Sequence, residues 1–317
     1  MRKFFFFILI ATIIHSQTKN IFPDDAVPVK LFGQGFFTEG PAQAADGSVY
    51  FCDLTFTEET NMQAGIIWKY DPVKDTTVVF RSPSGMAGGI QFDEDENMIV
   101  CEGADFGGRK IIKTDMKTGK SKIVGALYNG KPYNSPNDLV IDKKGRIYFT
   151  DPRYAGYESV DQPVMGVYRI DTDGSAELII SDIKMPNGIA LSPDEKILYV
   201  GCNFEGDEKN KPLMCIYKCR IDDMEGVNSP EVFIKCVEDA GPDGITVDSD
   251  GNLYAAVRDE KNPAVKVYNK EGKEIDSVSL SEVPSNLTFG KNSDSHILFI
   301  TAGKSLYKIK TNEENIK

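Results

Sequence analysis

Short apolar segments separated by polar turns recur along this chain, and six of them begin with a similar cassette. Each cassette has a small or polar front residue, a Gly, Asp, Asn or Pro within the next two positions, and then mostly apolar residues. The front residues are spaced by 49, 49, 50, 56 and 42 residues, and they are Glu39, Gly88, Asn137, Asn187, Asp243 and Ser285. A period of this length is typical of folds built from repeated units.

The segments after each cassette have the pattern of β-strands. An apolar strand leads to a turn rich in Asp and Gly, and a second strand of β-branched and aromatic residues follows, as in 137–150 and 243–256. Later segments such as 65–71 and 166–171 alternate apolar and polar residues, which predicts half-buried strands. With little helical periodicity, the pattern predicts an all-β fold, a six-bladed β-propeller with four antiparallel strands per blade.

The alternation within the cassette strands predicts how they face the ring. Gly188 and Ala190 are small and would face the narrow central channel, whereas Ile189 and Leu191 would face neighbouring sheets. This arrangement puts the front residues together at one mouth of the channel. We expect the segment 27–32 to add an outer strand to the last blade and so close the ring.

The N-terminus has the pattern of a signal peptide. Basic residues precede an apolar run from Phe4 to Ile14, which is too short for the roughly 20 residues that span a bilayer. We therefore expect residues 1–17 to be a signal peptide, 18–317 to be a single propeller domain, and the protein to be exported, periplasmic or secreted. No cysteine follows the run, which argues against a lipid anchor, so no stable membrane anchor is expected.

Charge and residue content exclude several classes of function. The formal net charge of −12 argues against binding to nucleic acid and suits a protein that binds cations. After removal of residues 1–17 the only histidine is His296, so a multi-histidine zinc site is excluded. No G-x-S-x-G motif supplies the nucleophile of a serine triad. Most of the six cysteines are expected to be buried thiols, with one disulfide left open as an alternative.

Four of the front residues carry oxygen atoms suited to a hard metal ion. Carboxylates and amide carbonyls are the ligands that calcium prefers, and four of them leave coordination positions for water and substrate. Asn and Asp also begin turns on their own account, but four of them in register across separate repeats favour a shared site. The predicted ligands are Glu39, Asn137, Asn187 and Asp243.

Several runs of residues resemble the SMP-30/gluconolactonase family, from about Glu39 to Ile309. They are Asn-Ser-Pro-Asn-Asp-Leu at 134–139, Tyr-Phe-Thr-Asp-Pro-Arg-Tyr at 148–154, Pro-Asn-Gly-Ile-Ala-Leu-Ser-Pro-Asp-Glu at 186–195 and Pro-Asp-Gly-Ile at 242–245. The resemblance implies a six-bladed propeller with a catalytic divalent metal, usually calcium, that hydrolyses sugar lactones. Relatives with the same geometry hydrolyse organophosphates.

The resemblance also implies roles for individual residues. Glu39, Asn187 and Asp243 match the metal ligands of the family, and Asn137 matches an Asn that binds the metal, directly or through water, and touches substrate. Two positions depart from the pattern. Gly103 stands where bacterial gluconolactonases often have His, and Arg153 replaces the second Pro of Asp-Pro-Pro-Tyr. Both changes weaken the case for glucono-lactone itself more than for lactone hydrolysis.

The sequence therefore predicts a hydrolase that opens a small-molecule lactone with a divalent metal, Ca2+ or another. The metal would polarise the carbonyl, and Asp243 would activate water or attack directly. Candidate substrate contacts, which could also be ordinary loop and strand-end residues, are Asn137, Asp138, Asp151, Arg153 and Tyr154. The alternatives are a phosphotriester hydrolase on the same site and a non-catalytic, calcium-stabilised propeller that binds protein or sugar. The oligomeric state is left open.

Overall fold

The computed structural model describes residues 20–313 except 63, 208, 223–225 and 238–239. The predicted signal peptide, residues 1–17, lies outside the described residues. Within the described part of the chain, no helix is long and apolar enough to cross a membrane.

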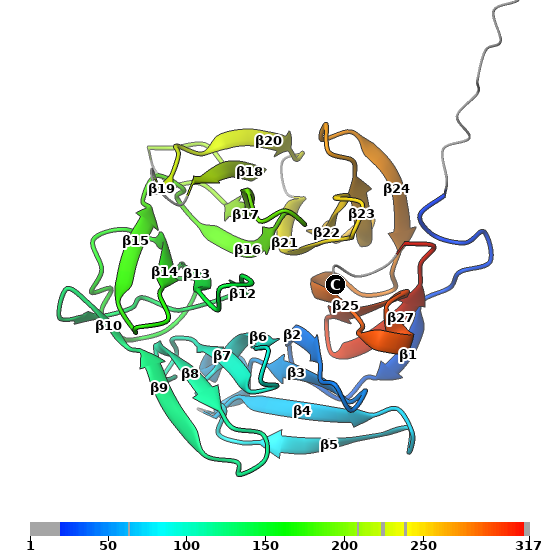
Figure 1. Ribbon diagram of the computed structural model, residues 1–317, viewed down its shortest axis with the longest axis horizontal. Helices are drawn as coiled ribbons and strands as arrows, with labels where there is room; N and C mark the ends of the chain where they lie inside the picture. The colour runs from blue at the N-terminus through cyan, green and yellow to red at the C-terminus, as the bar shows by residue number, and fades with distance from the viewer. Residues whose placement is uncertain (1–19, 63, 208, 223–225, 238–239, 314–317) are drawn as a thin grey trace, which may run out of the picture.

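Six antiparallel sheets are arranged in a ring, which confirms the predicted six-bladed propeller (Figure 1). Written from the channel outward, the first blade consists of β2 (Thr38–Gln43), β3 (Val49–Asp53), β4 (Ile66–Asp71) and β5 (Thr76–Arg81), and the second of β6 (Ala87–Phe92), β7 (Met98–Glu102), β8 (Lys110–Thr114) and β9 (Ser121–Gly125). The third blade consists of β12 (Leu139–Ile141), β13 (Ile147–Asp151), β14 (Gly166–Ile170) and β15 (Ala176–Ile180). The fourth consists of β16 (Pro186–Leu191), β17 (Ile197–Phe204), β18 (Leu213–Asp222) and β20 (Glu231–Lys235), with β19 (Gly226–Val227) also paired to β18.

The last two blades complete the ring. They are β21 (Gly241–Val247), β22 (Leu253–Arg258), β23 (Ala264–Tyr268) and β24 (Glu274–Ser279), and then β25 (Pro284–Phe289), β26 (Ile297–Ala302), β27 (Ser305–Lys310) and β1 (Val29–Phe32). The strand β1 pairs with β27, with Lys30 opposite Tyr307. The predicted closure by the segment 27–32 is thus confirmed, and the N-terminal part of the described chain completes the C-terminal blade.

Apolar side chains of adjacent blades pack against each other and hold the ring together. Ile189 and Leu191 from β16 lie in one buried cluster with Tyr148 of the preceding blade. Ile245 and Val247 from β21 lie in another with Tyr199 of the blade before it. Full burial of each such aliphatic side chain contributes about 1.5–3 kcal/mol. The large residues of the cassette strands therefore face the neighbouring sheets, as predicted.

Aspartate-centred turns connect the first and second strands of the blades at the end of the channel away from the cassettes. Between β12 and β13, the Asp142 carboxylate accepts hydrogen bonds from the backbone N–H groups of Lys144 and Arg146, at 3.0 and 2.8 Å. Gly145 adopts a φ of +79°, which a residue with a side chain adopts only at a cost. Asp248 and Asn252 form the same type of turn between β21 and β22.

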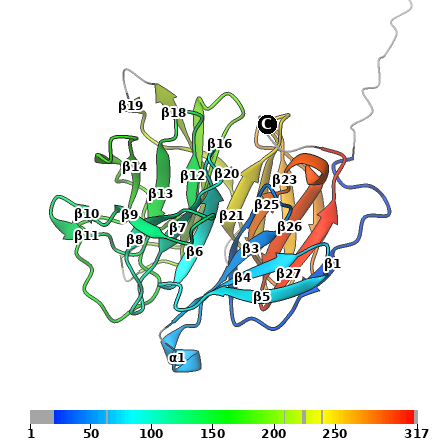
Figure 2. The same cartoon turned by 60° about the horizontal axis from the view of Figure 1, so that its bottom comes forward.

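Helical structure is scarce among the described residues. The four-residue helix α1 (Thr57–Thr60) projects from one face of the ring (Figure 2). A short 3-10 turn, η1 (Asn292–Asp294), precedes β26. The strands β10 (Leu127–Tyr128) and β11 (Lys131–Pro132) form a small hairpin beside the third blade. All six cysteines are free thiols, five buried and Cys236 half-buried, as expected from the sequence.

Candidate active site at the cassette end of the channel

A β-bulge lies at the cassette in the innermost strand of five blades. In β2 the register passes from Glu39 opposite Cys52 to Ala42 opposite Tyr50, which leaves one extra residue on the inner strand. The same shift occurs in β6, β16, β21 and β25. In the third blade the irregular segment precedes β12, where Asn137 donates its backbone N–H to Thr150. Because a bulge turns a side chain out of the regular alternation, it can aim the front residues toward the channel axis.

The side chains of Glu39, Asn187 and Asp243 are buried and come together at this end. The charge of the Asp243 carboxylate raises the pKa of Glu39, so the two groups lie close together, and the Asn187 amide hydrogen-bonds to Asp243. The same amide donates to the Tyr154 hydroxyl at 3.0 Å. Three side chains from three blades therefore meet at one place, with oxygen donors that suit a divalent cation.

The second residues of the cassettes pack at the centre of the ring. Four of them are glycine: Gly40, Gly89, Gly188 and Gly244. The other two are Asp138 and Asn286. The Asn286 amide lies 3.2 Å from the Glu39 carboxylate and 3.4 Å from that of Asp138, and it bridges them across the channel. Beyond this bridge the channel continues as a cavity of about 300 Å³, whose lining includes Gly40, Asp138 and Asn286.

Burial of three acids at one place makes their ionisation costly. Burial raises the pKa of Glu39 well above its ordinary value, and the charges of Asp243 and Asp138 raise it further. Burial also raises the pKa of Asp138 to about 7 and raises that of Asp243, which Arg258 opposes. A cation bound among these carboxylates would remove this cost, because opposite charge favours the ionised form.

The donor set fits a metal only if an amide oxygen takes part. Among the described residues, no three His, Cys, Asp or Glu side chains are grouped closely enough to hold an ion. The carboxylates of Glu39 and Asp243 supply two donors, and the amide oxygen of Asn187 supplies a third. Carboxylate and amide oxygens are hard donors, so the chemistry of the set matches Ca2+ or a similar divalent cation.

Asn137 differs from the other predicted ligands. Its side chain is half-buried and makes no hydrogen bond to another described residue, whereas its backbone carbonyl accepts the N–H of Gly89 at 2.6 Å. The side chain is thus available to a ligand at this mouth. Its predicted role toward metal or substrate stays a prediction.

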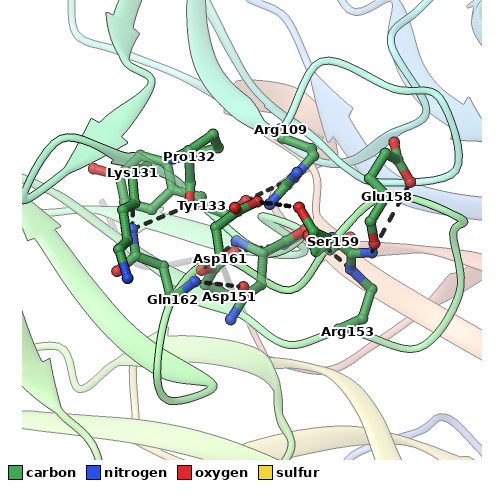
Figure 3. Close-up of polar contacts among 12 residues, drawn as sticks. Arg109, Lys131, Pro132, Tyr133, Asp151, Arg153, Glu158, Ser159, Asp161 and Gln162 are labelled. Carbon is green, nitrogen blue, oxygen red and sulfur yellow. Dashed lines mark hydrogen bonds and ion pairs between the residues drawn. The ribbon is translucent and has the colours of Figure 1, made fainter.

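Asp151 and Arg153 fix the loops beside the mouth (Figure 3). The Asp151 carboxylate accepts the backbone N–H groups of Asn134 and Ser135 at 2.8 and 2.6 Å, and burial raises its pKa to about 7. The Arg153 guanidinium donates to the carbonyl oxygens of Asn134, Glu158 and Ser159. Both side chains therefore position the segment that leads into Asn137, and a direct role toward substrate stays a prediction.

Aromatic side chains lie in several loops at the cassette end of the blades. Tyr154 is about half exposed and reaches Asn187 through its hydroxyl. Phe106 and Tyr157 stack with ring centres 5.5 Å apart, and the rings of Phe37 and Phe56 lie 5.8 Å apart. Such rings can contact the apolar faces of a sugar ring or an acyl chain.

Two residues of this region were missed by the sequence interpretation, Asn286 and Arg258. Asn286 could have been found by comparing the second cassette positions, where only Asp138 and Asn286 carry polar side chains. Arg258, at the end of β22, lies 3.4 Å from Asp243. The strand register gives its equivalents in the other blades, of which none is charged: Leu54, Gly103, Pro152, Asn203 and Gly303.

Comparison with known proteins shows which family has a similar sequence. Residues 37–304 match the model of the SMP-30/Gluconolactonase/LRE-like region. The chain is 30% identical to a gluconolactonase of Zymomonas mobilis, over 91% of this chain and 82% of that protein. It is also 30% identical to the lactonase drp35 of Staphylococcus epidermidis, over 79% of this chain and 71% of that one.

Solved structures share the fold over nearly the whole chain. A gluconolactonase from Xanthomonas campestris superposes with a TM-score of 0.77 at 26% identity, covering 91% of this chain and 90% of that one. Regucalcin from Agrobacterium tumefaciens, described as a calcium-binding protein, superposes with a TM-score of 0.72 at 18% identity, covering 93% and 97%. At this level of identity the second likeness concerns the fold alone.

Proposed function

The chain belongs to the SMP-30/gluconolactonase/LRE-like family, and from this premise we propose that it is a metal-dependent lactonase that opens sugar lactones. The observation that carries the proposal is the meeting of Glu39, Asn187 and Asp243 at the cassette end of the channel. These side chains would hold the divalent metal, with Ca2+ as the first candidate. The curated relatives named gluconolactonase and lactonase support the reaction type.

Hydrolysis of a lactone requires a base and stabilisation of negative charge on the carbonyl oxygen. Bound at this site, a divalent cation would supply that stabilisation by polarising the carbonyl. Asp243 would take a proton from the attacking water, whose oxygen bonds to the carbonyl carbon. The ring C–O bond then breaks, and the proton passes to the departing alkoxide, which gives the hydroxy acid.

The surroundings of Asp243 suit it to this role. It is buried where the three side chains meet, so a water that attacks a lactone held there would lie beside its carboxylate. Asn187 hydrogen-bonds to it and fixes its direction, and Arg258 lies 3.4 Å from it. Asn137 and Tyr154, which both come from the third blade, are our candidates for orienting the lactone.

The test is a pH-stat assay on a panel of aldonolactones, with Ca2+ present and after chelation. We expect turnover with Ca2+, its loss with a chelator, and a rise in thermal stability on adding Ca2+, since a ligand of the folded state stabilises it. Asp243→Asn should lower kcat roughly 10²- to 10⁴-fold. The control Asp250→Asn lies in an exposed turn away from the mouth and should leave kcat unchanged.

Three results would change the proposal. Bound Ca2+ without turnover of any lactone would favour a non-catalytic binding propeller. Turnover of phosphotriesters in preference to lactones would favour the organophosphate reaction at the same site. A single turnover in labelled water could also place the labelled oxygen in the Asp243 carboxylate rather than in the product. That result would show that this carboxylate attacks the lactone directly.

A further inference from the structure

Arg258 is a cation at the mouth of the site with most of its hydrogen-bonding capacity unused. Its guanidinium lies 3.4 Å from the Asp243 carboxylate, which is the long limit of a hydrogen bond. The Arg258 side chain is 44% exposed, whereas that of Asp243 is 4% exposed. The arginine thus reaches from solvent to the edge of the buried acid.

The other two arginines near the mouth differ in this respect. The Arg153 guanidinium is taken up by three carbonyl groups of its own loops, and Arg109 donates to the carbonyl of Tyr133 and to Asp161 (Figure 3). Within the described part of the chain, the only acceptor that Arg258 contacts is Asp243. A guanidinium presents several N–H donors in a planar fork, so most of those on Arg258 remain available to a ligand.

The guanidinium is also held in place. It lies over the ring of Phe37, with 5.6 Å between its central carbon and the ring centre, and Phe37 packs against Phe56. A cation over an aromatic face is attracted by the electron density of the ring. The contact with Phe37 therefore restricts the Arg258 side chain, and binding a ligand would require little further ordering of it.

The charge balance leaves this cation for the substrate. If a divalent cation binds to Glu39 and Asp243, it compensates their two negative charges. Of the carboxylates whose charge acts on Arg258, this leaves Glu205, which is exposed and screened by water. A guanidinium preferentially binds planar carboxylates through paired hydrogen bonds. Because Arg258 is adjacent to Asp243, such a carboxylate would belong to the molecule whose lactone ring lies at Asp243.

We propose that Arg258 is a specificity-determining residue that selects lactones carrying a carboxylate outside the ring that is opened, such as the monolactones of sugar diacids. The inference rests on the proposed lactonase function and adds the substrate class. It also gives a role to a charged residue that occurs at this register position in the fifth blade alone.

The test compares two lactones that differ only at the sixth carbon. D-glucaro-1,4-lactone carries a carboxylate there, and D-glucono-1,4-lactone carries a hydroxymethyl group. Arg258→Met should raise KM for the glucaro-lactone roughly 10- to 100-fold, the range for loss of a hydrogen-bonded charge, and that for the glucono-lactone less than about 3-fold. Arg258→Lys, which keeps the charge without the planar fork, should give an intermediate KM for the glucaro-lactone.

Lys261→Met is the matched control. Lys261 is an exposed cation in the loop after β22, and its side chain makes no contact with Asp243, so its loss should not separate the two lactones. The proposal is overturned if Arg258→Met raises KM equally for both lactones, since Arg258 would then act only through Asp243. It is also overturned if neither KM changes.

Calorimetric titration with D-glucarate separates this inference from the proposed function, because binding of this diacid involves no turnover. Binding that is at least 10-fold weaker in Arg258→Met than in Lys261→Met supports the anion site even if no lactone is hydrolysed. Equal binding of D-glucarate by the two variants, together with unchanged lactone selectivity, overturns the inference and leaves the lactonase proposal intact.

Discussion

Because glycine lacks a Cβ atom, glycines in the inner strands allow neighbouring strands to approach closely around the channel. A Cβ built on Gly188 would lie 2.3 Å from the carbonyl oxygen of Asp243, 2.8 Å from the Cα of Gly244 and 2.8 Å from the nitrogen of Ile245. These are backbone atoms of the next blade and cannot move aside as a flexible side chain would. The glycine thus allows β16 and β21 to come together, and this contact brings Asn187 beside Asp243.

Gly188→Ala should therefore force these two strands apart. We expect a loss of about 1–3 kcal/mol in the free energy of unfolding, typical of an overpacked core, together with weaker Ca2+ binding. Urea denaturation and calorimetry measure the two effects. Gly201→Ala is the control, because a Cβ on Gly201 in the same sheet meets its nearest atom at 3.4 Å, an ordinary contact. Equal stability of the two variants would contradict the close-approach argument.

The loop between β13 and β14, residues 152–165, shows how an element is positioned beside the site. Gln162 donates to the carbonyls of Tyr128, Lys131 and Pro132 (Figure 3). The Glu158 carboxylate accepts the N–H groups of Asp105 and Phe106. Together with Arg153, these contacts tie the loop to segments on both sides. Tyr154, near its start, is thereby held within reach of Asn187.

Arg153→Ala should loosen this loop without unfolding the ring. Its loss leaves the carbonyls of Asn134, Glu158 and Ser159 without their donor, which should lower stability by about 1–3 kcal/mol. Hydrogen exchange should rise in residues 154–161, and kcat/KM should fall as Tyr154 loses its fixed position. Arg169→Ala, in the same blade with Asp171 and Glu177 as partners, should leave exchange of these residues unchanged. Equal exchange in the two variants would exclude a positioning role for Arg153.

At the scale of the whole molecule, residues at equivalent positions of the repeats can be predicted from the sequence, whereas residues found in one blade alone cannot. The front residues Glu39, Asn187 and Asp243 could be predicted because a closed ring brings equivalent positions of its repeats together. Arg258 is absent from the equivalent position of every other blade, so no repeat pattern marks it. The partners of Arg153 could not be predicted either, because they depend on how an irregular loop folds back on its neighbours.

One acidic residue from the loop before β25 links the two strands that close the ring. One oxygen of the Glu282 carboxylate accepts from Lys30 of β1 at 2.6 Å and from Ser305 and Tyr307 of β27 at 2.7 Å each. The other oxygen accepts the backbone N–H of Lys304. Burial alone would raise the pKa of Glu282, but the hydrogen bonds from Lys30, Tyr307 and Ser305 outweigh it and lower the pKa to about 2.

This shift makes closure of the ring sensitive to acid. Because the pKa of Glu282 is lower in the folded than in the unfolded chain, its stabilisation is fully present above about pH 4.5 and is lost as the pH falls toward about 2. A shift of this size corresponds to about 3 kcal/mol, which we reduce to about 1–2 kcal/mol because the carboxylate is partly exposed.

Glu282→Gln should thus be less stable than the unaltered protein at pH 7, by a margin that narrows between pH 4.5 and 2. Urea unfolding across this range measures the margin, with the exposed Glu271→Gln as control. A margin that stays constant from pH 7 to pH 3 would show that the closure does not depend on the charge of Glu282.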